Sequence, residues 1–81
     1  MRATVLVRPK AGILDPQGKA VENSLRHLGF DVGEARVGRL IDLDVTASSP
    51  DEARAAVGLM CEQLLANSLI ESYEISLGDG A

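Results

Sequence analysis

Apolar and polar residues alternate with a period of two in three stretches of the chain, and this alternation predicts β-strands. The stretches run from Arg2 to Arg8, from Ile41 to Val45 and from Tyr73 to Leu77. A shorter extended piece, Ala35 to Val37, precedes a turn or bulge at Gly38-Arg39. The long stretches place most of their apolar side chains on one face, as expected for a sheet that is covered on one side.

Two intervening segments change to the three- to four-residue spacing of amphipathic helices. In the first, Val21, Leu25 and Leu28 form an apolar stripe, and Gly29 follows as a helix terminator. The second segment ends at Asn67-Ser68, and its predicted stripe consists of Ala53, Val57, Met60 and Leu64.

Both helices are predicted to begin with a proline that follows a capping side chain. Asp15 precedes Pro16, and Ser49 precedes Pro50. Proline suits the first helical position because its missing N–H would have no intrahelical partner there. Glu52 can reach back to Ser49 and complete a capping box.

The predicted order of elements is β-α-β-β-α-β in a single domain, residues 1–81, with a frayed tail from Gly78 to Ala81. This order favours an α+β fold, a ferredoxin-like two-layer sandwich with an antiparallel sheet and both helices on one face. Leu6 and Leu40 project from the other sheet face, which is less polar than a fully solvated face. We therefore expect the chain to associate through its sheets into a dimer.

The composition favours a partner as a source of stability. A chain of 81 residues buries only about 60–65% of the surface that it exposes when unfolded. Domains of this size usually add a disulfide, a metal or a partner. Cys61 and His27 are the only residues of their types, which excludes an internal disulfide and a structural zinc site.

Charge and hydropathy argue against nucleic-acid and membrane partners. The net charge is −4, and Phe30 and Tyr73 are the only aromatic residues. A protein that binds a phosphate backbone usually clusters Lys and Arg and stacks bases on aromatic rings. No apolar run approaches the roughly 20 residues of a membrane span, and residues 1–9 do not form a signal peptide. We expect a cytoplasmic protein.

The segment before the first helix is similar to a phosphate-binding loop but departs from it in spacing. Five residues separate Gly12 from Gly18-Lys19, whereas the loop requires four. Pro16 lacks an N–H that such a loop uses, and Ala20 stands where Ser or Thr would hold magnesium. We interpret the segment as a capped helix start, with an anion bound at the helix N-terminus beside Lys19 as the alternative.

Other chemically capable groups also have structural interpretations. Asp42 and Asp44 share a strand face, about 7 Å apart by strand geometry, but alternation places polar residues on that solvated face by default. Cys61 is interpreted as a partly buried packing residue, because His27, a predicted solvated helix residue, is its only potential imidazole partner. We predict no catalytic, cofactor-binding or metal-binding residues in this chain.

Five blocks of sequence occur in the order seen in one known family. They are Leu14–Glu22, Leu28–Phe30, Arg36–Ile41, Met60–Asn67 and Ile70–Ile75. Through these blocks, from about Val5 to Leu77, the chain resembles the small subunit of phosphoribosylformylglycinamidine synthase, the PurS family. Ser68 departs from the family's proline after Leu-Ala-Asn, which is expected to loosen a turn.

The resemblance implies a non-catalytic role in de novo purine biosynthesis. In this family the large synthetase subunit converts formylglycinamide ribonucleotide to the amidine with ATP and magnesium, and a glutaminase subunit supplies ammonia. The small subunit is implied to bring the two together as a homodimer or tetramer, to help in ammonia transfer and to bind no cofactor itself. The implied candidate partner contacts are Asp15, Gln17, Gly18 and Lys19 at the first helix, and Arg36, Gly38 and Arg39 at the turn.

Two other functions remain as alternatives. Ferredoxin-like domains also serve as small-molecule-sensing regulatory modules that dimerise through their sheets. Binding of an amino acid or nucleotide at micromolar strength to the isolated chain would favour that function. An anion-binding enzyme would instead lose an activity of the isolated chain on Lys19→Ala substitution.

Overall fold

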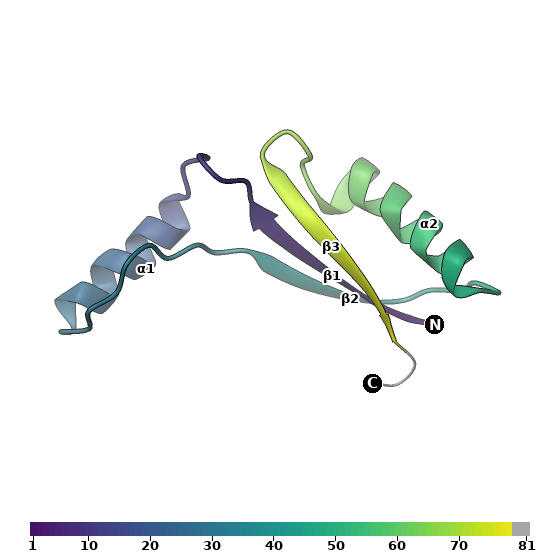
Figure 1. The fold of residues 1–81 in the computed structure, drawn as a ribbon, viewed down its shortest axis with the longest axis horizontal. Helices are drawn as coiled ribbons and strands as arrows, with labels where there is room; N and C mark the ends of the chain where they lie inside the picture. The colour runs from purple at the N-terminus through teal and green to yellow at the C-terminus, as the bar shows by residue number, and fades with distance from the viewer. Residues whose placement is uncertain (79–81) are drawn as a thin grey trace.

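The computed structural model describes residues 1–78 and contains a three-stranded antiparallel sheet and two α-helices (Figure 1). The elements are β1 (Arg2–Pro9), α1 (Pro16–His27), β2 (Arg39–Asp44), α2 (Pro50–Met60), the π-helical turn η1 (Cys61–Leu65) and β3 (Glu71–Gly78). The strand order is β2-β1-β3. Gly78 ends β3, and the rest of the predicted frayed tail lies outside the described residues.

The apolar faces of the three strands coincide because the register aligns them. Val5 of β1 lies between Ile41 of β2 and Ile75 of β3. Side chains alternate between the two faces of a strand, so these three project to the same side. Helix α2 packs on this side of the sheet. The resulting core is aliphatic and consists of Ala3, Val5, Val7, Val45, Ala53, Val57, Cys61 and Ala66.

Both predicted N-terminal caps are confirmed, and one detail is corrected. The Asp15 carboxylate accepts a hydrogen bond from the Gly18 N–H at 3.0 Å, and the Ser49 hydroxyl accepts one from the Glu52 N–H at 3.1 Å. The Glu52 carboxylate reaches back to Ser48, whose N–H donates to it at 3.3 Å, rather than to Ser49. The reciprocal half of the capping box is therefore displaced by one residue.

The buried face of α2 and the following turn η1 differs from the predicted stripe. Ala53, Val57 and Cys61 are fully buried, whereas Met60 is 38% exposed and Leu64 is 84% exposed. The buried residues are spaced four apart, because this row of the helix packs along the sheet. Cys61 is therefore completely buried rather than partly buried.

The predicted strand from Ala35 to Val37 is not formed within the described residues. The N–H groups of this segment donate to carboxylates instead of to a neighbouring strand. Ala35 donates to Glu22 at 3.2 Å, and Val37 donates to Asp15 at 2.8 Å. Carboxylates on and before α1 thus accept the hydrogen bonds that a neighbouring strand would accept. The observed order of elements is therefore β-α-β-α-β.

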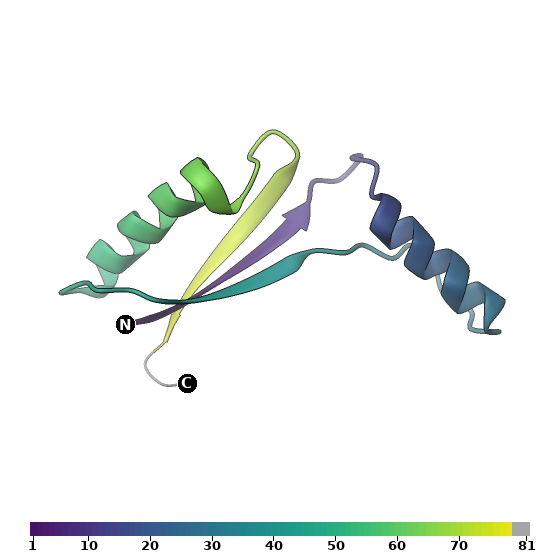
Figure 2. The same cartoon turned by 180° about the vertical axis from the view of Figure 1, so that it is seen from behind.

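The predicted position of the first helix on the sheet is also wrong for the single chain. In Figures 1 and 2, α1 points away from the end of the sheet, and the segment that leads to β2 returns beside it. We call α1 together with residues 28–38 the arm. The α+β class and the antiparallel sheet are confirmed, but only α2 covers this sheet.

The arm is held together by contacts between α1 and its returning segment. Gly29 ends the helix as predicted, with a φ of 96°, and its N–H donates to the Arg26 carbonyl at 3.0 Å. Arg26 also donates to the carbonyls of Val32 and Gly33. The Arg26 guanidinium lies 3.1 Å from the Glu22 carboxylate, and Glu22 is only 6% exposed because it faces the returning segment.

Candidate functional site

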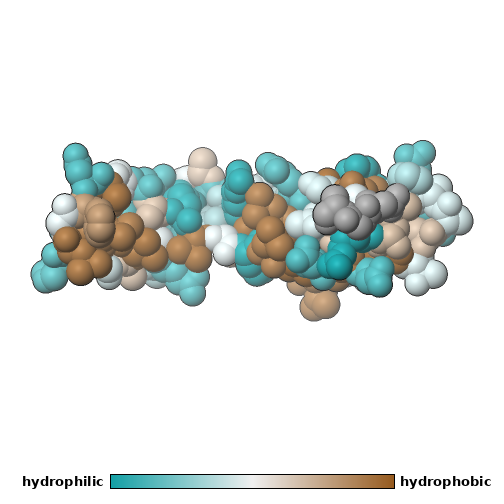
Figure 3. Space-filling view, turned by 90° about the horizontal axis from the view of Figure 1, so that it is seen from below, coloured by the Kyte–Doolittle hydropathy of each residue, from teal (hydrophilic) through white to brown (hydrophobic). Residues whose placement is uncertain are grey.

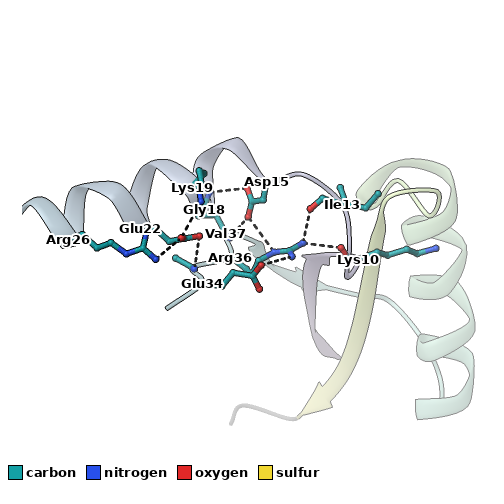
Figure 4. Close-up of polar contacts among 11 residues, drawn as sticks. Lys10, Ile13, Asp15, Gly18, Lys19, Glu22, Arg26, Glu34, Arg36 and Val37 are labelled. Atoms are coloured by element: carbon teal, nitrogen blue, oxygen red, sulfur yellow. Dashed lines mark hydrogen bonds and ion pairs between the residues drawn. The ribbon is translucent and has the colours of Figure 1, made fainter. Parts of the chain in front are cut away.

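The seven predicted contact residues gather where the arm meets the sheet, around the start of α1 and the entry to β2 (Figure 4 draws four of them). We call this region the joint. It consists of Asp15, Gln17, Gly18, Lys19, Arg36, Gly38 and Arg39. After α1 the chain returns to the start of this helix. The residues from Asp15 to Lys19 and those from Arg36 to Arg39 therefore lie close together in space.

Asp15 links both sides of the joint. One carboxylate oxygen accepts from the Gly18 N–H, and the other accepts from the Val37 N–H at 2.8 Å and lies 3.9 Å from the Arg36 guanidinium. The Val37 N–H, followed by the Gly18 N–H, holds the pKa of the Asp15 carboxyl below its usual range. The start of α1 therefore already contains an anion of the chain's own, which argues against the alternative of an external anion there.

Arg36 fixes the loop between β1 and α1. Its guanidinium donates to the carbonyl of Lys10 at 2.9 Å and to that of Ile13 at 3.3 Å. The same group lies 3.7 Å from the Glu34 carboxylate. Arg36 thus connects the returning segment of the arm to the loop that leaves the sheet.

The two glycines of the joint are required by close backbone approach. A Cβ on Gly18 would lie 2.3 Å from the Ala35 carbonyl oxygen, and one on Gly38 would lie 2.2 Å from the Val7 carbonyl oxygen. No real Cβ contact is this short, so any side chain at either position would displace the backbone. These residues set the direction in which the arm leaves the sheet.

Arg39 connects three elements through its guanidinium. It forms two hydrogen bonds with the Glu71 carboxylate of β3, at 2.7 and 3.0 Å, and donates to the Leu65 carbonyl of η1 at 2.7 Å. This pairing raises the pKa of Arg39 and lowers that of Glu71. Glu71 borders the joint but is not among the residues predicted from the sequence, since a pairing between distant strands leaves no local signal.

The outer side of the joint is available to a partner. Gln17 and Lys19 are exposed, and the Lys19 ammonium lies 3.7 Å from the Glu22 carboxylate. Next to them, a cleft of about 220 Å³ is lined by ten residues: Pro9, Ile13, Leu14, Asp15, Gln17, Val37, Gly38, Arg39, Ile70 and Glu71. Leu14, which is 82% exposed, supplies an apolar contact at its edge.

The remaining candidates for chemistry have structural partners. Asp42 accepts a hydrogen bond from the Thr4 hydroxyl at 2.9 Å, and Asp44 lies 3.7 Å from the N-terminal ammonium. Burial raises the pKa of the Cys61 thiol, which disfavours the nucleophilic thiolate. Within residues 1–78, no three His, Cys, Asp or Glu side chains are grouped so as to hold a metal ion.

None of the helices described in residues 1–78 is long and apolar enough to cross a membrane. A small α+β domain with a polar joint and a protruding arm has the features of a binding or assembly subunit. A scan of family models matches residues 2–79 to PurS, described as phosphoribosylformylglycinamidine (FGAM) synthase. The chain belongs to the PurS family.

Individual relatives agree with this assignment over nearly the whole chain. The phosphoribosylformylglycinamidine synthase subunit PurS of Synechocystis is 47% identical over 85 aligned residues, which cover 99% of this chain and 81% of that protein. The crystal structure of Methanocaldococcus jannaschii PurS, one of the subunits of formylglycinamide ribonucleotide amidotransferase in the purine biosynthetic pathway, superposes with a TM-score of 0.81. It is 36% identical, and the match covers 93% of this chain and 92% of that one.

A structure of PurLQS from Thermotoga maritima contains a further match. The matching chain is 33% identical, with 93% of each chain covered and a TM-score of 0.85. The shared fold therefore includes the form that PurS takes within an assembled complex.

Proposed function

We propose that this protein, a PurS subunit of FGAM synthase, joins the synthetase and glutaminase subunits of that enzyme and contributes no active site of its own. The observation that carries the proposal is the match, over 93% of each chain, to a chain of the PurLQS structure of Thermotoga maritima. Three candidate residues agree with it, since the carboxylates of Asp15 and Asp42 accept structural hydrogen bonds and the Cys61 thiol is buried.

In the proposed complex, the synthetase subunit uses ATP and magnesium, and the glutaminase subunit supplies nitrogen from glutamine. This chain holds the two subunits in a fixed relative position, and this arrangement helps ammonia pass between them. We further propose that it acts as a homodimer in the cytoplasm. The exposed apolar side chains, including Leu28, Phe30 and Leu64, support self-association.

We assign contact with the other subunits to the outer side of the joint. Lys19 and Gln17 project from the first turn of α1, and the neighbouring cleft offers Leu14 together with the Arg39–Glu71 pair. A cleft with both apolar and charged groups can receive a protruding side chain of a partner protein. The hydrogen bonds of Asp15 and Arg36 pre-organise the joint, which lowers the entropy lost when a partner binds.

Reconstitution tests the role of the chain directly. The synthetase and glutaminase subunits are mixed with ATP, magnesium and formylglycinamide ribonucleotide, and product is measured with glutamine or with ammonium as nitrogen source. We expect this chain to raise glutamine-dependent turnover at least tenfold and to change ammonium-dependent turnover much less. Equal glutamine-dependent rates with and without the chain would refute the proposal.

A further inference from the structure

The chain contains two asparagines, Asn23 and Asn67, and each is followed by a serine. Asparagine is one of the chemically labile residues of proteins. When the next residue is small, its peptide nitrogen can attack the side-chain amide carbon and release ammonia. Both asparagines are exposed, so neither exposure nor the following residue distinguishes them. Any difference in their reactivity must come from the backbone around them.

The backbone around Asn23 prevents this attack. Asn23 and Ser24 lie within α1, where an N–H is bonded to the carbonyl four residues earlier. The Ser24 carbonyl also accepts a hydrogen bond from the Leu28 N–H at 3.1 Å. A ring between the Asn23 side chain and the Ser24 nitrogen would require the helix to unwind at this position. The helix therefore protects Asn23.

The backbone around Asn67 leaves the next peptide nitrogen free. Asn67 follows η1 and begins the turn that leads into β3, at the end of the sheet from which the arm leaves (Figure 1). Among the hydrogen bonds of residues 1–78, none has the Ser68 N–H as its donor. The nucleophile of the reaction is therefore available at this position without the loss of a helix or a strand.

The turn also holds the Asn67 amide in a position suited to the attack. The Oδ1 atom of Asn67 accepts a hydrogen bond from the Leu69 N–H at 3.1 Å. Because Leu69 follows Ser68, this bond folds the asparagine side chain over the Ser68 peptide, as in an Asx turn. A hydrogen bond to Oδ1 also stabilises the negative charge that this oxygen gains when a nucleophile attacks the amide carbon.

We propose that Asn67 is a site of spontaneous deamidation in the folded protein and that Asn23 is not. Hydroxide removes the proton of the Ser68 nitrogen, which forms a bond with Cγ of Asn67. The Cγ–Nδ2 bond breaks, and the nitrogen leaves as ammonia after it takes a proton from water. Water then opens the cyclic imide at either carbonyl carbon, which gives an aspartyl or an isoaspartyl residue. The sum of these steps consumes one water and releases one ammonia.

The modification changes a turn that supports the joint. The Asn67 N–H donates to the Glu71 carboxylate at 2.8 Å, and the Asn67 carbonyl accepts from the Glu71 N–H at 2.7 Å. The same carboxylate forms two hydrogen bonds with Arg39. An isoaspartyl residue lengthens the main chain by one carbon and displaces these groups, and either product adds a negative charge near Glu71. Deamidation therefore destabilises the folded protein.

Mass spectrometry of tryptic peptides tests the proposal, because trypsin places Asn23 in residues 20–26 and Asn67 in residues 55–81. During incubation of the folded protein at mildly alkaline pH, Asn67 should be deamidated at least tenfold faster than Asn23. In guanidinium chloride the two rates should become similar, because both sites are then unfolded Asn-Ser sequences. Equal rates in the folded protein, or a faster reaction at Asn23, would overturn the proposal.

Ser68→Pro provides the matched control, since proline has no N–H to lose and cannot form the imide. The variant should keep Asn67 intact under the same conditions, and an unchanged rate would contradict attack by the Ser68 nitrogen.

The deamidated protein can be separated by its added negative charge on an anion-exchange column. It should unfold at a lower urea concentration than the unmodified protein. An unchanged urea midpoint would contradict the proposed effect on the turn from Asn67 to Glu71.

Discussion

Gly18 and Gly38 lie where two backbone segments of the joint touch, and their lack of a side chain sets the direction of the arm. The neighbouring charged residues act on the same contact. Asp15 receives N–H groups from both segments, and Arg36 binds the loop carbonyls. Residues that the family resemblance implies as partner contacts thus have an immediate structural role, and any contact with a partner is additional to it.

Gly38→Ala should destabilise the folded protein by about 3 kcal/mol, because overpacking against fixed backbone is costly. The added Cβ would meet the Val7 carbonyl oxygen at 2.2 Å. Gly33→Ala is the matched control, since a Cβ there meets no atom within 4 Å, and it should change stability by no more than about 0.5 kcal/mol. Urea unfolding measures both. Equal effects of the two substitutions would contradict the proposed role of Gly38.

Lys19→Ala combined with Gln17→Ala should weaken assembly with the synthetase and glutaminase subunits about tenfold, while helical content stays unchanged. Both side chains are exposed and belong to the outer side of the joint. Lys10→Ala, also at an exposed lysine, serves as a control for the loss of one positive charge. Titration of reconstituted glutamine-dependent activity provides the measurement. If the double variant assembles with unchanged affinity, the contact lies elsewhere.

At the scale of elements, the arm is stabilised by carboxylates that substitute for a neighbouring strand. The N–H groups of Ala35 and Val37 hold the pKa values of Glu22 and Asp15, respectively, below their usual ranges. Arg26 and Lys19 beside Glu22, and Arg36 beside Asp15, favour the same charged forms. The sequence predicts a strand for Ala35 to Val37, but the hydrogen-bond partners of this segment come from α1 and its cap, and no strand forms there.

Acidification should therefore loosen the arm. A carboxyl whose pKa is lowered by folding contributes stability that is complete above its unfolded pKa and is lost as the pH falls through the folded value. The unfolded values lie near 4 for both residue types, so the urea midpoint should be stable above about pH 5 and fall below about pH 4.

The double variant Asp15→Asn with Glu22→Gln should show a lower midpoint at neutral pH and a shallower fall on acidification. A residual fall is expected, because folding also lowers the pKa of Glu52 and that of Glu71. An unchanged pH profile in this variant would show that the two carboxylates do not provide the acid-sensitive stability.

The whole molecule is elongated, with principal extents of 50 × 29 × 14 Å. Within the described residues 1–78, apolar side chains of the arm such as Leu28 and Phe30 remain exposed. Figure 3 shows apolar residues gathered at the α1 end of the molecule. In the proposed homodimer, association covers these surfaces, so folding and association are coupled. Stability then depends on the concentration of the chain. The same dimer would present two joints, one from each copy, to the other subunits of the enzyme.

Thermal unfolding should accordingly shift with concentration. A hundredfold dilution of the unmodified chain should lower Tm by several degrees, because dissociation accompanies unfolding. A variant with Val21→Asp and Leu28→Asp, both at exposed apolar positions of the arm, should have a lower Tm that does not depend on concentration. Differential scanning calorimetry distinguishes these cases, and a concentration-independent Tm for the unmodified chain would argue against coupled folding and association.

The sequence by itself determined the features that depend on neighbouring residues. The alternation in β1, β2 and β3, the caps at Asp15 and Ser49, and the helix end at Gly29 follow from local backbone chemistry and period. The ordered blocks from Leu14 to Ile75 also identified the family. For the seven candidate contact residues, the sequence supplied their identities but no geometry.

Only the tertiary structure decided where these elements lie. It showed that Ala35 to Val37 bonds to carboxylates, that Cys61 rather than Met60 faces the sheet, and that α1 leaves its own sheet. An apolar stripe indicates that one face of a helix will be buried, but it does not indicate which surface that face packs against. The packing surface depends on contacts between segments that are distant in the chain, such as the hydrogen bond from Arg36 to the Lys10 carbonyl. The local sequence pattern does not predict such contacts.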